Sequence, residues 1–295
     1  MYPEARKFQN ESGSYSTRML HRPNDRAENM KPSWNTPPTQ LRLSRENVHI
    51  WRAVLDLPSE SVQEFKGSLS IDERMKAEHF RYERDRSRFI AARGILRLIL
   101  ASYLSVYPGA IRFCYGKDGK PRLENIFGKT GIQFSLSHSE GLALYVFTQG
   151  RQVGIDVEYM REISEMKEII EQFFSVRERT FFDTLPTSEK QETFFKWWTR
   201  KEAFAKATGE GLSYPLDGFD ALLAKGKSVE SLGILGGAQE RPRWSIWDVR
   251  PAEEFAGAVV VEGGSLDVQY WQWPGKSRDY PERIRSNVHS FNVSI

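Results

Sequence analysis

The sequence predicts an α+β protein, in which helices and strands are mixed along the chain. The stretches 70–104, 162–185 and 190–208 read as helices, whereas shorter stretches around them alternate apolar and polar residues as strands do. Two of these strands follow each other as a hairpin, without an intervening helix. Strict βαβ alternation is therefore absent, and a purely parallel sheet is not expected.

The expected elements can be placed in order along the chain. A strand at 48–54 comes first, and the first helical stretch then begins at a capping box formed by Ser70 and Glu73. A glycine-rich loop is expected at 116–121. The later strands are expected at 134–139 and 142–147 (a hairpin turned at Glu140-Gly141), 153–158, 244–247, 257–261 and 268–271.

The composition narrows the class of protein. The chain has 295 residues, of which 39% are hydrophobic and 27% charged, so it can form a substantial core in one or two domains. A net charge of +3 argues against a strongly basic nucleic-acid-binding protein. The one cysteine excludes an internal disulfide and fits a reducing, cytoplasmic location. No apolar run approaches the length of a membrane span, so no membrane association is expected.

Both ends of the chain differ from its centre. Residues 1–40 are rich in Ser, Asn, Pro and Arg and poor in aliphatic residues, so they are predicted to form a disordered extension. A transit peptide is the alternative, and acidic residues in this range argue against it. Residues 276–295 are again polar and are predicted to form a tail.

The helix at 190–208 carries charges where an amphipathic helix has apolar residues. Six apolar residues between positions 194 and 205 occupy one arc of the helical wheel, and Gly209 supplies a stop. Lys201 lies near the middle of this arc and Glu202 inside its edge. Because buried charges must be paired or bound, we expect the arc to face a charged site that Glu202 and Lys206 serve. A surface ion pair is the alternative.

The strand at 153–158 presents two carboxylates on one face. Asp156 and Glu158 point to one side and the intervening valine and isoleucine residues to the other, because strand side chains alternate. A solvated strand face is the alternative. If Glu202 packs against this face, three carboxylates converge, and they form a ligand set that suits Mg²⁺ beside a phosphate. No histidine accompanies them, so zinc is not predicted.

Basic residues that could bind phosphate are also present. Seven Lys and Arg residues lie between Arg74 and Arg93, but acidic residues are interleaved, so a salt-bridged helix surface is the alternative. Lys120 lies in the glycine-rich loop, where backbone N–H groups can line an anion. His138 ends a strand between two serines, where a structural role is the alternative. Two G-K-S sequences lack the upstream glycine of a P-loop.

Together these motifs resemble the 4′-phosphopantetheinyl transferases of the surfactin-synthetase-activator type, in their bacterial and cyanobacterial form. The resemblance covers roughly residues 45–275. Each motif is weak alone, whereas their order and spacing are specific. The matching segments are Gly119-Lys120-Pro121, Phe134 to Ser139, Gly154-Ile155-Asp156-Val157-Glu158, Phe173-Phe174-Ser175 with Glu178, Trp198 to Lys206, and Pro215 to Phe219.

The resemblance implies an activity and an architecture. Such an enzyme transfers 4′-phosphopantetheine from coenzyme A to a serine of an apo acyl carrier protein, or of a carrier domain of a polyketide or peptide synthase, and releases 3′,5′-ADP. A monomer is implied, with two similar α+β halves, 41–150 and 151–275, related by a pseudo-twofold axis and coenzyme A in the cleft between them. A Mg²⁺-dependent phosphoesterase and a non-catalytic nucleotide-binding module are the alternative functions.

The resemblance also implies roles for individual residues. Asp156, Glu158 and Glu202 would hold Mg²⁺ together with the coenzyme A pyrophosphate. Glu202 and Lys206 would be catalytic, with Glu202 as base, metal ligand or both and Lys206 at the leaving phosphate. A lysine of the family is replaced here by Glu73, so this chain departs from the pattern near the 3′-phosphate. The implied coenzyme A contacts are Lys76, Arg88, Lys120, Pro121, Ser137, His138 and Lys206.

Overall fold

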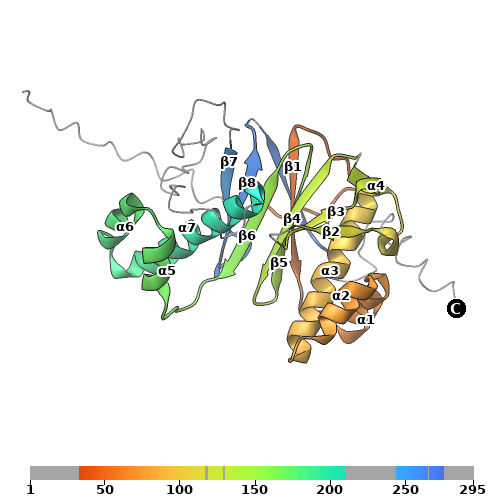
Figure 1. Ribbon diagram of the computed structural model, residues 1–295, viewed down its shortest axis with the longest axis horizontal. Helices are drawn as coiled ribbons and strands as arrows, with labels where there is room; N and C mark the ends of the chain where they lie inside the picture. Colours follow the sequence, from red (N-terminus) through yellow and green to blue (C-terminus); the bar gives the residue numbers. More distant parts are fainter. Residues whose placement is uncertain (1–32, 117–118, 129, 210–243, 265, 276–295) are drawn as a thin grey trace, which may run out of the picture. The chain divides into compact units, whose positions relative to one another are not determined.

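The described chain has the mixed order of helices and strands that the sequence predicts (Figure 1). The computed structural model describes residues 33–116, 119–128, 130–209, 244–264 and 266–275, so most of the predicted extension and the whole predicted tail lie outside the described residues. The strands are β1 (Asn47–Val54), β2 (Phe113–Tyr115), β3 (Pro121–Leu123), β4 (Ile132–Ser139), β5 (Leu142–Gln149), β6 (Val153–Tyr159), β7 (Trp244–Val249), β8 (Phe255–Glu262) and β9 (Asp267–Gln272). The helices are α1 (Ser59–Ser68), α2 (Ile71–Glu78), α3 (Glu83–Leu104), α4 (Asn125–Gly128), α5 (Met166–Phe173), α6 (Val176–Asp183) and α7 (Thr187–Thr208).

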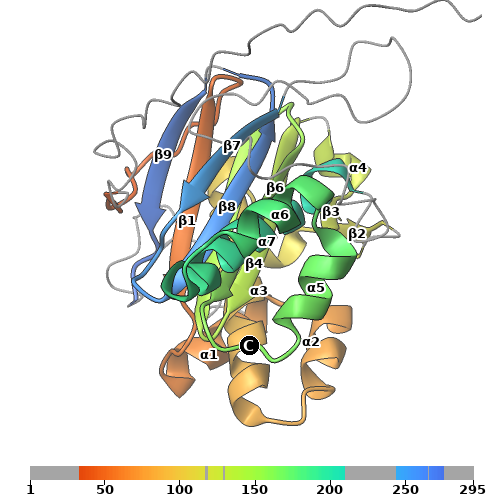
Figure 2. The ribbon, with the colours of Figure 1, turned by 90° about the vertical axis from the view of Figure 1, so that its left-hand side faces the viewer.

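Two sheets lie between two sets of helices (Figure 1, Figure 2). One sheet has the order β4-β5-β1-β9, and the other has the order β6-β8-β7. Helices α1 to α3 cover the outer face of the first sheet, and α7 covers that of the second. Among the named strands of the described chain, every pairing is antiparallel except that of β1 with β9, which joins the two ends of the described chain in one sheet. Among the described residues, no helix is long and apolar enough to cross a membrane.

The strand pattern explains these layers. Along β5, Tyr145 and Phe147 join the core under α3, whereas Leu144 and Val146 join a second core between the two sheets. Both sets are fully buried, because neither face of this strand meets solvent. Each such side chain contributes roughly 1.5–3 kcal/mol through burial. The central strand β5 therefore supports two cores at once.

Local signals predicted from the sequence set the ends of several elements. Glu140 and Gly141 both have positive φ, 39° and 79°, as a two-residue hairpin turn of type I′ requires. Ser70 and Glu73 form the predicted capping box at the start of α2. Gly209, with φ of 75°, ends α7 in the left-handed conformation. These three predictions are confirmed.

A short segment before the first strand packs on the sheet edge. Asn35 donates its backbone N–H to the Tyr270 carbonyl and accepts from the Gln272 N–H, at 3.0 and 2.8 Å. Trp34 packs edge-on against Tyr270, and the Arg52 guanidinium lies over its ring. Residues 34 and 35, which lie inside the predicted extension, therefore extend the sheet beyond β9.

Helix α7 packs on β6 at one glycine. A Cβ atom at Gly154 would lie 1.9 Å from the Ala203 carbonyl oxygen and 2.5 Å from the Ala207 nitrogen. Only a residue without a side chain lets the helix backbone rest directly on the strand at this point. This close approach brings Lys206 of α7 within hydrogen-bond distance of Asp156 on β6.

We predict that Gly154→Ala destabilises the protein, because its methyl group would meet helix backbone that cannot move independently of α7. The free energy of unfolding should fall by about 3 kcal/mol or more, the upper range for overpacking, as measured by denaturant unfolding. Gly128→Ala is the matched control, since a Cβ atom there meets nothing within 4 Å. Equal stability of the two variants would contradict the proposed contact.

Candidate active site

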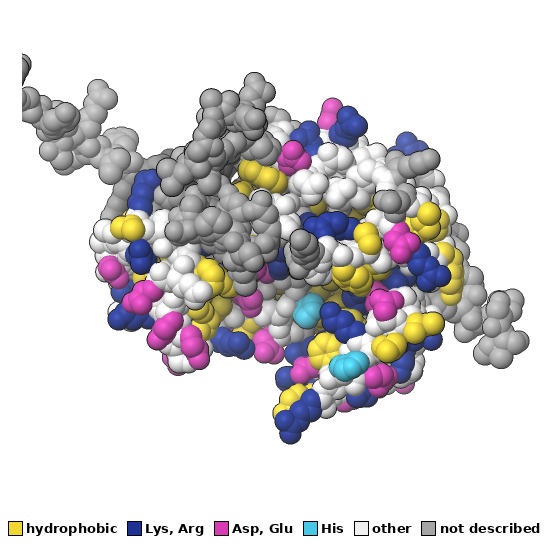
Figure 3. Space-filling model, viewed as in Figure 1, with side chains coloured by type: hydrophobic (Ala, Val, Ile, Leu, Met, Phe, Trp, Pro, Cys, Tyr) yellow, Lys and Arg dark blue, Asp and Glu magenta, His cyan; other side chains and the backbone are white. Residues whose placement is uncertain are grey.

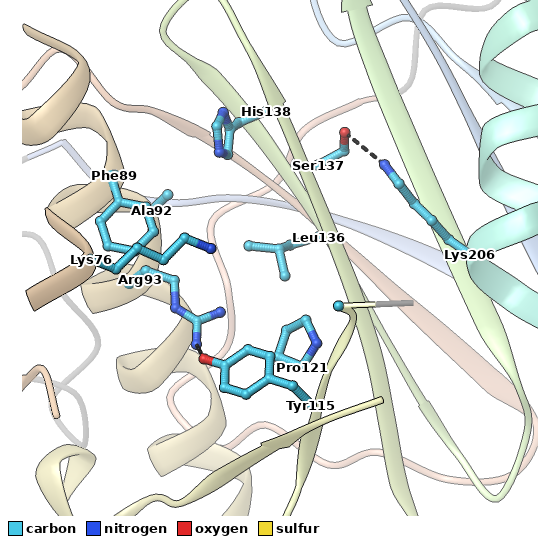
Figure 4. A pocket seen from close by; sticks show the side chains of 11 residues that line it. Lys76, Phe89, Ala92, Arg93, Tyr115, Pro121, Leu136, Ser137, His138 and Lys206 are labelled. Carbon is cyan, nitrogen blue, oxygen red and sulfur yellow. Dashed lines mark hydrogen bonds between the residues drawn. The ribbon is translucent and has the colours of Figure 1, made fainter. Parts of the chain in front are cut away.

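A cavity of about 280 Å³ opens beside the junction of β4 and α7 (Figure 4). Its walls come from α2, α3, the β2–β3 hairpin and β4, with one lysine from α7. The lining residues are Lys76, Phe89, Ala92, Arg93, Tyr115, Gly119, Pro121, Leu136, Ser137, His138 and Lys206. Five of the residues predicted to contact coenzyme A are therefore together here: Lys76, Pro121, Ser137, His138 and Lys206.

The other two predicted contacts have protein partners. Arg88 donates to both carboxylate oxygens of Asp56, at 2.7 and 2.9 Å, and more weakly to Glu140 at 3.4 Å. The bonds to Asp56 tie α3 to the segment after β1, and the bond to Glu140 ties it to the hairpin turn. The Lys120 ammonium donates to the carbonyl oxygens of Val153 and Lys206, at 2.6 and 2.8 Å. Lys120 therefore links the glycine-rich loop to β6 and to the last turn of α7.

Basic and acidic side chains are interleaved over α2 and the start of α3 (Figure 3). Arg86 pairs with Glu83 at 3.0 Å and lies 3.9 Å from Glu78, which also pairs with Lys66. This is the salt-bridged surface that the sequence left open as an alternative. Lys76 and Arg93 differ from these residues, because both line the cavity.

Glu73, where the resemblance implies a lysine, carries a buried carboxylate that two arginines hold. Burial alone would raise the pKa of Glu73, but the guanidinium groups of Arg93 and Arg97 outweigh it and hold the pKa below its ordinary value. Both arginines donate to this carboxylate at 2.7 Å. Glu73 is not among the lining residues, whereas its partner Arg93 is. Arg93 therefore brings a positive charge to the wall of the cavity.

Tyr115 and Phe89 were not singled out as site residues from the sequence, and Arg93 was named only among the seven basic residues that could bind phosphate. Two weak signals point to them. Phe89 and Arg93 are four residues apart on α3, so they share a face of the helix. Tyr115 pairs with Pro121 across the β2–β3 hairpin. If the glycine-rich loop predicted at 116–121 connects two strands, the residue just before it must lie beside the residue at its end.

Asp156 is held at the edge of the cavity by two donors. Its Oδ1 accepts from the Ser137 hydroxyl at 2.8 Å and from the Lys206 ammonium at 2.7 Å, and Lys206 also donates to Ser137 at 3.1 Å (Figure 4). Its Oδ2 is buried and has no hydrogen-bond partner within the described chain. A buried carboxylate oxygen without a donor is unfavourable unless a cation binds it.

Two of the three predicted carboxylates, Glu158 and Glu202, have raised pKa values. Burial, followed by repulsion from Asp156 and, more weakly, from Glu158, raises the pKa of Glu202 from 4.5 to about 7, against the opposing effect of Lys206. Burial and Asp156 also raise the pKa of Glu158, although the Ser139 hydroxyl donates to it at 3.0 Å. Within the described ranges, no three His, Cys, Asp or Glu side chains are already spaced as a metal site.

Lys201 does not face this site. Its ammonium pairs with Glu178 at 2.9 Å, both side chains are 0% exposed, and the Phe174 ring lies 5.4 Å away. Glu178 also accepts from the backbone N–H of Ser175 in the capping box of α6. The expectation that the whole apolar arc of α7 faces a charged site is therefore wrong, because a buried ion pair satisfies Lys201 inside the helical layer.

His138 adds a neutral imidazole to the cavity. Its side chain is exposed and lines the cavity. Burial lowers the pKa of His138, and the positive charges of Lys206, Arg88 and Lys76 lower it further. The neutral ring is therefore favoured near neutral pH, and the positive charge of the cavity wall comes from its lysines and arginine.

Comparison with known proteins gives a consistent result. Residues 152–260 match the family model described as the 4′-phosphopantetheinyl transferase superfamily. The chain is 37% identical over 244 residues to the 4′-phosphopantetheinyl transferase HetI of a Nostoc species, covering 83% of this chain and 100% of that protein. It is 29% identical to the 4′-phosphopantetheinyl transferase Sfp of Bacillus subtilis, covering 60% and 77% of the two chains.

We predict that Glu202 makes the stability of the metal-free protein depend on pH. Because its folded-state pKa is raised from 4.5 to about 7, the folded protein binds more protons than the unfolded chain between these values. The free energy of unfolding should therefore decrease as the pH rises through this window. Glu202→Gln should remove that decrease, so its melting temperature should exceed that of the wild type at pH 8 by more than at pH 4.5. The exposed Glu162→Gln is the control, and identical profiles of all three proteins would contradict the shift.

Proposed function

The chain belongs to the 4′-phosphopantetheinyl transferase superfamily, and from this premise we propose that the cavity of Figure 4 holds coenzyme A and that the carboxylates beside it serve the transfer. The enzyme moves 4′-phosphopantetheine from coenzyme A to a serine of a carrier protein and releases 3′,5′-ADP. The observation that carries the proposal is the triangle of Ser137, Asp156 and Lys206 at the cavity edge. The phosphoesterase alternative has no support from the relatives.

The charges of the cavity suit a donor with several phosphates. Lys76 and Lys206 lie on opposite sides of it, and Arg93 lies between the helices and the β2–β3 hairpin (Figure 4). Coenzyme A carries a 3′-phosphate and a pyrophosphate that are separated by a ribose, so two separate positive regions match its charge distribution. We assign the pyrophosphate to the side of Lys206, because the carboxylates are there too.

The residues present fit a divalent cation. Burial and, after it, the nearby charge of Asp156 raise the pKa values of Glu158 and Glu202, and Oδ2 of Asp156 is buried without a partner in the described chain. Asp156, Glu158 and Glu202 would therefore hold Mg²⁺, which prefers carboxylates, water and substrate phosphate. When bound, Mg²⁺ neutralises charge on the pyrophosphate and so assists departure of 3′,5′-ADP.

The chain's own groups supply the proton transfers and the orientation. Glu202, with a pKa of about 7 in the metal-free protein, is suited to accept the proton of the carrier serine near neutral pH. Lys206, which donates to Ser137 and Asp156 at the cavity edge, would stabilise the charge that develops on the leaving phosphate. Ser137 holds both Asp156 and Lys206, so it orients the pair. We therefore propose two roles for the Glu202 carboxylate, as the base for the carrier serine and as a ligand of Mg²⁺.

The architecture supports the proposal of two similar halves. Helices α3 and α7 each have 22 residues, and each covers one sheet. The strand orders differ, since β9 adds a parallel strand to the first sheet only. We propose a pseudo-twofold relation between the halves 41–150 and 151–275, a monomer, and an acyl or peptidyl carrier protein as partner.

We predict that Glu202→Gln transfers phosphopantetheine at least about 10²-fold more slowly than the wild type, because it removes both basicity and charge. Mass spectrometry of an apo carrier protein incubated with coenzyme A and Mg²⁺ measures the rate. Glu162→Gln should match the wild type. If the wild type leaves a panel of apo carriers unmodified yet hydrolyses coenzyme A, the transferase function is wrong and the protein is a phosphoesterase.

We also predict that Mg²⁺ raises the melting temperature of the wild type in the absence of coenzyme A, since the ion binds the folded protein only. Asp156→Asn should lose most of this increase, because it removes a charge from the carboxylate with the unpartnered oxygen. Differential scanning fluorimetry with and without EDTA measures both effects. An Asp156→Asn protein that Mg²⁺ stabilises as much as the wild type would exclude this residue as a ligand.

A further inference from the structure

Tyr115 presents an aromatic ring to the cavity rather than to the core. The residue is 48% exposed although it lines a cavity between α3 and the β2–β3 hairpin. Its cross-strand partner is Pro121, and in Figure 4 the two rings lie side by side, with Leu136 nearby. The wall formed by Tyr115, Pro121 and Leu136 is apolar, whereas Lys76 and Arg93 are positively charged. The cavity is therefore divided into an apolar wall and a cationic side.

The side chain of Tyr115 is fixed by a hydrogen bond to Arg93 on the protein side. Its hydroxyl accepts a hydrogen bond of 2.8 Å from Arg93, which is only 6% exposed. Arg93 is fixed in turn by Glu73, at 2.7 Å, and its guanidinium lies over the Phe113 ring at 4.8 Å. A side chain that is already ordered loses little conformational entropy when a ligand packs on it. The structure thus provides a rigid aromatic surface with a cation at its edge.

We propose that Tyr115 is the surface on which the adenine ring of coenzyme A stacks, and that it determines specificity at the nucleotide end of the donor. The inference rests on the proposed function, because it takes coenzyme A to occupy this cavity. A purine stacks favourably on an aromatic face, and the ribose phosphate attached to it then lies close to cations. Lys76 and Arg93 are the cations adjacent to the ring, whereas Lys206 is on the far side (Figure 4).

The experiment compares Tyr115→Leu, Tyr115→Phe and the wild type in the complete enzyme. Leucine removes the aromatic face, so the KM for coenzyme A should rise about 5-fold or more while kcat changes by less than about twofold, the size expected for loss of one stacked base. Phenylalanine keeps the face and should stay near the wild type. Tyr82→Leu, at an exposed tyrosine outside the cavity, is the matched control.

Two inhibitors separate stacking from a general collapse of the cavity. Tyr115→Leu should weaken inhibition by 3′,5′-ADP, which carries the base, and leave inhibition by inorganic pyrophosphate unchanged. Equal weakening of both inhibitors would overturn the proposal, because the cavity itself would have changed. An unaltered KM for coenzyme A would overturn it as well, and so would a Tyr115→Phe variant as weak as Tyr115→Leu, since the hydroxyl and not the ring would then matter.

The same assays keep this inference apart from the proposed function. If the wild type modifies no apo carrier and 3′,5′-ADP does not bind to it, the proposed function fails and Tyr115 has no nucleotide to receive. If the wild type transfers phosphopantetheine and Tyr115→Leu behaves like it toward both inhibitors, only the role of Tyr115 fails.

Discussion

The contact between β4 and β6 is the constraint on which the site depends. These are edge strands of different sheets, and serine side chains join them. Ser135 accepts from the Ile155 N–H at 3.3 Å, and Ser139 accepts from the Tyr159 N–H at 3.1 Å. On the same face of β4, Ser137 donates to Asp156 and Ser139 donates to Glu158. The alternating serines of β4 thus satisfy backbone donors of β6 and orient Asp156 and Glu158 with one row of hydroxyls, which places both carboxylates where the two sheets meet.

Helix α7 distributes its charges between two environments. Lys201 is neutralised by Glu178 within the helical layer, whereas Lys206, five residues later, reaches Asp156. The buried pair has no exposed surface, so removing either partner alone would leave an unpaired charge in the core. Lys201 and Glu202 are adjacent in the segment Trp198 to Lys206, but they have different surroundings and different roles. Lys201 ties the helix to α6 through Glu178, whereas Glu202 feels the negative charges of Asp156 and Glu158.

The sequence predicted what depends on local pattern and missed what depends on distant partners. Helix ends, the hairpin turn and the faces of β6 follow from capping, φ preferences and alternation, and they are confirmed. Arg88 and Lys120 were predicted to contact coenzyme A, and their partners Asp56 and Val153, which lie far away in sequence, were not predicted. The parallel pairing of β1 with β9 is equally non-local. No periodicity within one segment carries this information, since it arises only when the layers pack.

The cluster around Glu73 shows how a substitution of opposite charge can leave a cavity cationic. Glu73 sits behind the wall and accepts from Arg93 and Arg97, so one negative charge is surrounded by two positive ones. Arg97 is fully buried and also donates to the carbonyls of Pro108 and Ile111, whereas Arg93 reaches the cavity. A ligand therefore meets the guanidinium first and the carboxylate only through it. Glu73 thus fixes an arginine in the wall, and the cavity keeps a positive charge beside this buried carboxylate.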